Sequence, residues 1–370
     1  MKKILLITRP IAPPWDEASK NFAYTLAKTI PTLEFGMLTN GHLANLPKNI
    51  RQHSIYTSNS FSYLQKIRLV KNLRKIRKDY NILHYLFTPT KSNAFLVKKF
   101  FNYKKDTRSI QTVATVRQDL YSDKEIKKML FGDLIITYSD YAKTKLNTLG
   151  FNNVKRIYPG INLAKYKKTK KDEELMRKKN ISKSNFVINF TGEYTRLGAI
   201  DLVIDSFIKI TKVIHNAKLT LAVRIKNSQD ARKKKLVIKK LRHKKLLKNV
   251  SFFDDGNYKM EDVYNLCDIS LFPVSNMNGK FDVPLAVIEA MACEKTVIIS
   301  DLIILKELNN GKNSVIIKKG SIEQLTKAIL NLYNNPEKRI IIGQEARKFA
   351  KEKFDIKKIA DIYKQIYNKL

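Results

Sequence analysis

Short apolar runs, each followed by a longer segment with helical periodicity, recur along the chain. The runs are rich in Ile, Val, Leu and Phe and are of strand length. Strands that alternate with helices in this way build parallel sheets. The sequence therefore predicts an α/β protein. The predicted strands are Ile4–Ile7, Ile82–Phe87, Ile110–Val116, Leu134–Thr137, Phe186–Phe190, Leu219–Val223, Val250–Phe253, Ile269–Phe272 and Thr296–Ile299.

The length of 370 residues predicts two domains, because a domain typically holds ~100–200 residues. A lysine-rich polar stretch precedes the strand at Phe186, and such a shift in composition is typical of a linker. We predict a first domain over residues 1–165, a linker over 166–184, a second domain over 185–349 and a C-terminal helix over 350–370.

The charge is strongly positive, with 71 Lys and Arg against 33 Asp and Glu, which gives a formal net charge of +38. Such a field attracts nucleic acid, acidic lipid headgroups and phosphorylated ligands alike. The basic residues are spread over the whole length, and Lys, Asn and Ile are abundant together, which nucleotide bias in a genome can also produce. The charge alone therefore does not select a partner.

Composition also sets the expected compartment. Cys267 and Cys293 lack a CxxC spacing, so neither a disulfide framework nor a zinc site is predicted. No apolar run approaches the ~18 residues of a membrane span. The apolar stretch at the amino end is too short for a signal peptide. We expect a cytoplasmic protein.

Two segments, Leu64–Lys78 and Arg232–Lys248, have apolar residues at helical spacing among many Lys and Arg. Such a helix can lie on an anionic membrane surface or can pack on a sheet with a solvated outer face. Neither segment has the interleaved aromatic residues of a single-strand nucleic-acid binder. Specific nucleic-acid binding is therefore not expected.

Some side chains near the predicted strand ends are candidate ligand contacts. Trp15 lies in the loop after the first strand, where it could form a platform for a sugar or pack on its own domain. Arg117 follows the Ile110 strand and could bind a ligand or form a salt bridge. His84 lies within a buried-looking strand, which favours a core histidine. No GxGxxG follows the first strand, so a dinucleotide fingerprint is not supported.

Glu289 lies in an apolar helical pattern within Phe281–Ser300, just before the last predicted strand. A carboxylate on such a helix can accept hydrogen bonds from ligand hydroxyls at the carboxyl ends of parallel strands. The alternative is an ordinary surface glutamate of an amphipathic helix.

Several motifs follow one another in order along nearly the whole chain. In the second half they are the glycine loop within Phe190–Phe207, then Cys267–Pro273, then Ile288–Cys293. In the first half they are Pro13-Pro14 after the first strand, Ser139 and Tyr158–Asn162. Together these motifs resemble glycosyltransferase family 4.

This resemblance implies a GT-B fold, in which two Rossmann-like domains face each other across a central cleft and the C-terminal helix packs back on the N-terminal domain. It implies a retaining, metal-independent hexosyltransferase of glycan biosynthesis with no cofactor, which uses a nucleotide-diphospho-sugar as donor. The acceptor would be a hydroxyl of a sugar or of a lipid-linked molecule. A lipid-linked acceptor would favour peripheral contact with the inner face of an anionic membrane.

The resemblance also implies site residues. Cationic side chains and helix amino ends would neutralise the departing nucleoside diphosphate in place of a metal, and Glu289 would bind ribose hydroxyls. We expect Arg196, Lys226 and Asp282 to be catalytic. The expected donor-binding residues are Gly192, Arg196, Gly198, Arg224, Lys226, Pro273, Asp282 and Glu289, and the expected acceptor-binding residues are Trp15, Asp16, Lys20 and Arg117.

The chain departs from the family pattern at four places. Phe281 stands where the first glutamate of a two-glutamate motif is expected, and Asp282 is the nearest carboxylate. Leu197 replaces a lysine before Gly198, residues 15–18 replace paired glycines, and Arg117 replaces a histidine.

Two other functions are compatible with the same sequence. One is a nucleotide-sugar epimerase or hydrolase on the same scaffold, because a fold alone does not fix a reaction. The other is a polyanion-binding or membrane-surface protein with a degenerate site.

Overall fold

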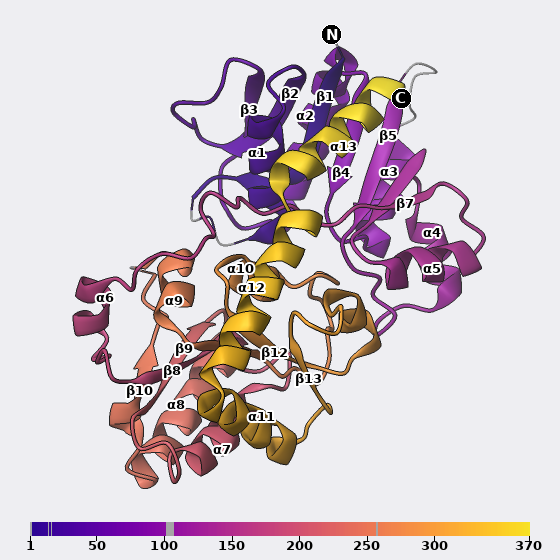
Figure 1. Ribbon diagram of the computed structural model, residues 1–370. Helices are drawn as coiled ribbons and strands as arrows, with labels where there is room; N and C mark the ends of the chain where they lie inside the picture. The colour runs from indigo at the N-terminus through magenta and orange to yellow at the C-terminus, as the bar shows by residue number, and fades with distance from the viewer. Residues whose placement is uncertain (1, 14, 16, 101–106, 257) are drawn as a thin grey trace. The chain divides into compact units, whose positions relative to one another are not determined.

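The computed structural model describes residues 2–13, 15, 17–100, 107–256 and 258–370 (Figure 1). The chain divides into two compact units. The first unit combines the described part of residues 1–160 with residues 279–282 and 355–370, and the second combines the described part of 161–278 with 283–354. Each unit is an α/β domain with one parallel sheet, as the sequence predicts.

The sheet of the first unit has the strand order β3-β2-β1-β4-β5-β6-β7, and all of its strand pairs are parallel. This is a Rossmann-like order, in which the connections reverse direction beside β1. The strands are β1 (Lys3–Ile11), β2 (Glu34–Asn40), β3 (Ile50–Tyr56), β4 (Ile82–Leu86), β5 (Arg108–Val113), β6 (Leu134–Thr137) and β7 (Val154–Arg156). The helices are α1 (Ala18–Thr29), α2 (Tyr63–Ile76), α3 (Lys91–Phe100), α4 (Asp123–Met129), α5 (Asp140–Thr148) and α13 (Ile356–Lys369).

The sheet of the second unit has the order β10-β9-β8-β11-β12-β13 and is also parallel throughout. Its strands are β8 (Phe186–Glu193), β9 (Ala217–Arg224), β10 (Val250–Phe252), β11 (Ile269–Phe272), β12 (Thr296–Ser300) and β13 (Val315–Ile317). Its helices are α6 (Glu173–Lys178), α7 (Ile200–Ile210), α8 (Ser228–His243), α9 (Met260–Leu266), α10 (Leu285–Ala292), α11 (Ile322–Asn334) and α12 (Pro336–Lys353). Short 3₁₀ turns cover Arg77–Asp79, Leu247–Asn249 and Ile303–Leu308.

The C-terminal helix packs on the first unit, as predicted, and its aromatic residues meet a buried histidine there. His84 of β4 stacks on Tyr363 with ring centroids 5.7 Å apart, and its Nδ1 is 2.7 Å from the Tyr367 hydroxyl. Its Nε2 is 2.7 Å from Oγ1 of Thr112. Both ring nitrogens of His84 are thus hydrogen-bonded inside the core, which confirms the prediction of a core histidine.

The predicted linker is wrong in its extent. Residues 166–184 belong to the second unit, where α6 contributes Leu175 and Met176 to a buried cluster with Val187 and Phe253. The many lysines of this stretch give it the composition of a polar linker, although it contains a short amphipathic helix with buried residues. The chain passes between units at Gly160–Ile161 and at Phe354–Asp355, and between these points residues 279–282 return to the first unit.

The predicted basic helix at Leu64–Lys78 forms α2, but only part of its apolar stripe is buried. Leu73 is buried in the core of the first unit, and Val70 and Ile76 pack partly against that core. Leu64 and Ile67 are exposed, together with Tyr63. Helix α2 therefore combines core packing with an exposed apolar strip among basic residues.

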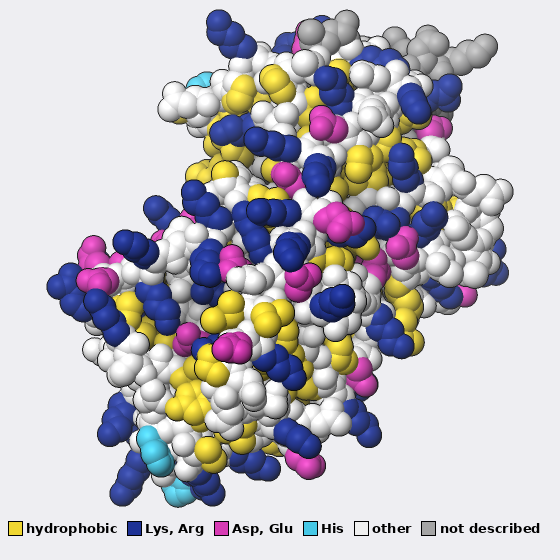
Figure 2. Space-filling model, viewed as in Figure 1, with side chains coloured by type: hydrophobic (Ala, Val, Ile, Leu, Met, Phe, Trp, Pro, Cys, Tyr) yellow, Lys and Arg dark blue, Asp and Glu magenta, His cyan; other side chains and the backbone are white. Residues whose placement is uncertain are grey.

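Lys and Arg side chains are distributed across both units on the face that Figure 2 shows, as the sequence indicates. Among the described residues, no helix is both long and apolar enough to cross a membrane.

Candidate functional site

A tight loop follows β8 and leads into α7 in the second unit. Gly198 in this loop has φ of 66°, a conformation that glycine adopts without strain. The Ser275 backbone N–H donates to the Leu197 carbonyl at 2.9 Å, and the Ser275 hydroxyl donates to the Gly198 carbonyl at 3.1 Å. The loop is therefore fixed against the segment that follows β11 and Pro273.

Two of the predicted cations bind one carboxylate at this loop. Glu193, the last residue of β8, accepts hydrogen bonds from Arg196 Nε at 2.5 Å and Arg196 Nη2 at 2.6 Å. It also accepts one from Lys226 Nζ at 2.7 Å. The Glu193 side chain is only 5% exposed, whereas those of Arg196 and Lys226 are 39% and 40% exposed. The arrangement is a buried carboxylate beneath two cations that reach solvent.

Asp230 ties the loop after β8 to the loop after β9. This buried carboxylate accepts hydrogen bonds from the Thr195 hydroxyl at 2.7 Å and from the Lys226 backbone N–H at 3.1 Å. Arg224, at the end of β9, pairs in register with Glu193. Because β8 and β9 are parallel neighbours, their carboxyl ends meet at one edge of the sheet. The structure thus brings Arg196, Arg224 and Lys226 to this edge.

Glu289 lies in α10 between two tyrosines of the same unit. The Tyr264 hydroxyl donates to Glu289 Oε2 at 3.2 Å, and Tyr166 also hydrogen-bonds this carboxylate. Burial raises the pKa of Glu289 to about 7, although both tyrosine hydrogen bonds and Lys165 oppose the shift. This is no ordinary surface glutamate. Its carboxylate changes charge near neutral pH, which is common at functional sites.

Asp282 belongs to the first unit, whereas Gly192, Arg196, Lys226 and Glu289 belong to the second. Asp282 is buried and accepts a hydrogen bond from the Ser139 hydroxyl at 2.6 Å. Its backbone N–H donates to the Ala114 carbonyl at 3.0 Å, and the neighbouring Phe281 ring packs edge-on against Tyr138. Asp282 was grouped with the donor-binding residues because it is the carboxylate nearest to Phe281, where the resemblance expects the first glutamate of the two-glutamate motif.

The predicted acceptor residues are held by partners of their own in the first unit. Trp15 stacks on Tyr24 with ring centroids 4.7 Å apart, and its side chain remains exposed. Lys20 is buried, and its ammonium donates to the Ala12 carbonyl at 2.9 Å. Arg117 forms a two-bond ion pair with Asp119, with both bonds at 2.8 Å. Asp16 lies outside the described residues.

Sequence reasoning missed Glu193, Tyr166 and Tyr264. Glu193 directly follows Gly192 in the quoted glycine loop, so its position was a usable signal. Tyr166 was placed in the predicted linker, and Tyr264 has no local signal because only the fold brings it to Glu289.

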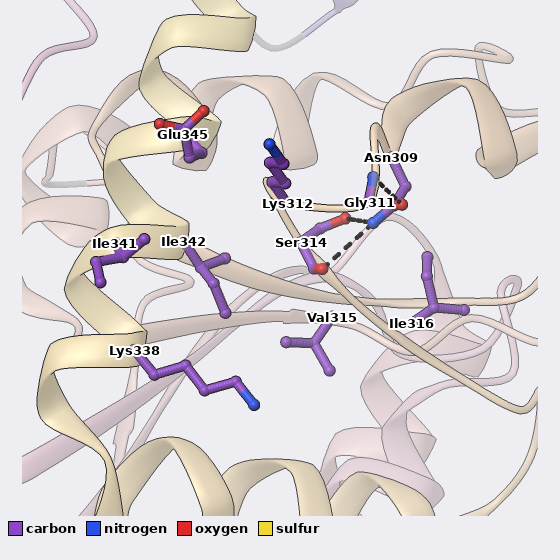
Figure 3. Close-up of a pocket in the computed structure, with 10 residues that line it drawn as sticks. All are labelled: Asn309, Gly311, Lys312, Ser314, Val315, Ile316, Lys338, Ile341, Ile342 and Glu345. Carbon is purple, nitrogen blue, oxygen red and sulfur yellow. Dashed lines mark hydrogen bonds between the residues drawn. The ribbon is translucent and has the colours of Figure 1, made fainter.

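A separate hollow of about 650 Å³ lies between the loop before β13 and α12. Figure 3 shows Lys312, Lys338 and Glu345 around it, together with the apolar Ile341 and Ile342. None of the predicted site residues that the structure describes lines this hollow. Among the described residues, no group of three or more His, Cys, Asp or Glu side chains is arranged to hold a metal ion.

Residues 171–349 match the family model described as glycosyl transferases group 1. This segment forms most of the second unit and contains Glu193, Arg196, Lys226 and Glu289. Together with the paired parallel-sheet domains, the match supports a glycosyltransferase of the GT-B fold.

Two relatives are uncharacterized glycosyltransferases of Methanocaldococcus jannaschii. One is 26% identical over 93% of this chain and 92% of its own length. The other is 23% identical over 68% of this chain and 62% of its own length, so that match spans less than two thirds of the relative.

Solved structures share the fold over the full length of the chain. HepE of Anabaena in complex with UDP and glucose is 16% identical, with a TM-score of 0.78 and full coverage of both chains. Sucrose-phosphate synthase of Thermosynechococcus elongatus is 15% identical, also with a TM-score of 0.78, over 100% of this chain and 99% of that one. At these identities the likeness establishes the fold.

Proposed function

We propose that the protein is a retaining glycosyltransferase that moves a hexosyl group from a nucleotide-diphospho-sugar to an acceptor hydroxyl. The observation that carries this proposal is the meeting of Arg196 and Lys226 at the glycine loop after β8. Two partly exposed cations at the carboxyl edge of a parallel sheet suit a diphosphate, because guanidinium and ammonium groups donate charge-assisted hydrogen bonds to phosphate oxygens.

In this proposal Arg196 and Lys226 stabilise the charge that develops on the leaving diphosphate as its bond to the sugar breaks. Arg224 lies at the same strand edge and adds positive charge. These cations supply the stabilisation that a metal ion provides in other transferases. Gly198 gives the loop its tight turn at the donor site, and Gly192 makes room for the Phe190 ring, which would lie 2.6 Å from a Cβ there. The ordered motifs that resemble glycosyltransferase family 4 support retention, and retention then requires no protein nucleophile.

We assign ribose binding to Glu289, whose carboxylate can accept hydrogen bonds from two vicinal hydroxyls. Tyr166 and Tyr264 orient this carboxylate. The structures of HepE were solved with UDP and glucose and with UDP-glucose, which makes UDP-glucose the first donor to test.

For the acceptor we propose a sugar or lipid-linked hydroxyl bound by the first unit, with Trp15 and Arg117 among the contacts. The exposed Tyr63, Leu64 and Ile67 of α2 lie among exposed basic residues. Apolar side chains beside Lys and Arg suit an anionic membrane surface. We therefore propose peripheral contact of α2 with the inner face of a membrane.

A screen of nucleotide sugars by thermal shift identifies the donor. Arg196→Ala and Glu289→Ala are then each expected to lower kcat/KM at least tenfold, which corresponds to about 1.4 kcal/mol of transition-state stabilisation. Lys178→Ala, which removes the cation of an exposed pair with Glu174 on α6, is the matched control. Unchanged kinetics in both site variants would contradict the assignment. Rapid conversion of the donor without an acceptor would indicate an epimerase or hydrolase instead.

A further inference from the structure

One carboxylate holds both cations of the proposed diphosphate site. The Arg196 Nη2 and Lys226 Nζ atoms are 2.6 Å and 2.7 Å from the same Glu193 oxygen, Oε1. The two nitrogens therefore lie within about 5 Å of each other, a separation at which like charges repel strongly outside bulk water. The Glu193 carboxylate that both nitrogens contact offsets this repulsion when no donor is bound.

The contacts that Glu193 makes are of the type that a phosphate group would make. The guanidinium edge and the ammonium group bind carboxylates and phosphates through the same N–H donors. The Glu193 side chain is nearly buried, whereas about two fifths of each cation is exposed. A diphosphate that arrives from solvent thus meets the exposed surface of the cations and competes with the carboxylate for their N–H groups.

Resting on the proposed function, we propose that Glu193 is the resident counter-ion of the donor site. Its carboxylate holds Arg196 and Lys226 in the empty site, shares or yields them when the diphosphate binds, and regains them when the nucleoside diphosphate leaves. Glu193 is a positioning residue in this role. It lowers the affinity of the site for diphosphate and thereby speeds product release.

The competition has a defined consequence for Glu193→Gln. Without the negative charge, the two close cations lose the carboxylate that they share, so the melting temperature of the empty protein falls. An added anion then restores the compensation. The variant should therefore bind a diphosphate more tightly than the wild type and should gain more thermal stability from it.

Calorimetric titration with inorganic pyrophosphate tests this, at about 0.15 M salt so that distant charges of this basic protein are screened. We expect at least tenfold tighter binding by Glu193→Gln than by the wild type. Glu174→Gln makes the same charge change in the exposed pair with Lys178 and should bind as the wild type does. Equal or weaker binding by a folded Glu193→Gln protein would overturn the inference.

A second variant keeps the inference testable if Glu193→Gln does not fold. Glu193→Asp keeps the charge, but its shorter side chain cannot hold both cations at the observed distances. We expect its pyrophosphate affinity to lie between those of the wild type and Glu193→Gln, and affinity at or below the wild-type value would contradict the inference.

A parallel titration with nucleoside diphosphates separates the two levels of the proposal. If the wild type binds them and Glu193→Gln shows no increase, the donor site stands and only the role of Glu193 is wrong. If neither the wild type nor any of the variants binds nucleoside diphosphates or pyrophosphate, the proposed donor site itself is wrong.

Discussion

The Tyr264 hydroxyl donates a hydrogen bond to Glu289 across 3.2 Å, in surroundings that raise the pKa of this carboxyl group to about 7. Ribose hydroxyls bind the carboxylate better than the carboxylic acid, because the ionised form accepts charge-assisted hydrogen bonds. Donor affinity is therefore expected to rise several-fold between pH 6 and pH 8. Binding measured by calorimetry across this range should lose the pH dependence in Glu289→Gln.

The same substitution is expected to stabilise the empty protein. Since the folded-state pKa of Glu289 lies above its unfolded value of 4.5, its contribution to stability is lost as the pH rises towards 7. Glu289→Gln removes this loss, which amounts to roughly 2–3 kcal/mol at pH 8 after allowance for partial exposure to solvent. Urea unfolding at pH 8 measures whether Glu289→Gln raises the free energy of unfolding. A less stable variant would show that the carboxylate has a structural role.

Gly343 of α12 lies against the backbone of the turn after α10. A Cβ atom at this position would be 2.5 Å from the Glu294 carbonyl oxygen. In an ordinary helix Gly→Ala stabilises by about 0.5–1 kcal/mol. Here the substitution is expected to destabilise by about 1–3 kcal/mol, because backbone atoms must shift. The exposed neighbouring change Gln344→Ala should be close to neutral in the same thermal unfolding experiment.

His84 is expected to make the first unit sensitive to acid. Burial lowers its pKa from 6.5 to about 3, so the unfolded chain takes up a proton below pH 6.5 that the folded chain excludes. This group therefore costs up to about 1.4 kcal/mol of stability per pH unit as the pH falls from 6.5 towards 3. When the free energy of unfolding is plotted against pH, its fall on the acid side (the acid limb) should be less steep for His84→Gln than for the wild type.

The exposed His243, at the end of α8, supplies the control for that measurement. His243→Gln should leave the acid limb unchanged. If His84→Gln is too unstable to study, Tyr367→Phe removes one hydrogen bond of the imidazole and should lower stability while keeping the acid limb. An unchanged acid limb in His84→Gln would contradict the account of its burial.

Helix α2 is expected to bind anionic vesicles through its basic residues. Reversal of four exposed charges to Glu should abolish co-sedimentation, because each basic residue near such a surface contributes about 1 kcal/mol. The residues are Arg68, Lys71, Arg74 and Lys75. The matched control reverses four exposed charges of α8 and the residues after it, namely Lys235, Lys239, Arg242 and Lys244. Equal loss in both variants would indicate a general charge effect rather than a site on α2.

The predicted strands that form the centres of both sheets were recognisable because they are continuous apolar runs. The strands Ile50–Tyr56, Val154–Arg156 and Val315–Ile317 were missed, because these sheet-edge strands are short or rich in polar residues. Glu34–Asn40 was missed as well, since Gly36 and Asn40 interrupt its pattern. Gly36 is needed there because Tyr80 and Leu5 fill the space of a Cβ.

The candidate site was predictable where its residues share one motif and not where the fold assembles them. Arg196 and Gly198 lie in one loop, and Lys226 follows the neighbouring strand, so strand order alone brings them together. The tyrosines of Glu289 come from α9 and from the stretch after Gly160, which no spacing in the sequence relates to α10. The contacts of Asp282 with Ser139 and Ala114 could not be predicted from the sequence, because residues 279–282 leave the second unit and pack on the first.

The anomeric configuration of the product is the direct test of a retaining glycosyl transfer that depends on Arg196. Once the screen has identified a donor and a hydroxyl acceptor, proton NMR of the glycoside reports the configuration at the transferred carbon. We expect the product to keep the anomeric configuration of the donor and Arg196→Ala to form it at least tenfold more slowly than the wild type does. A product of inverted configuration, or transfer that does not depend on Arg196, would contradict it.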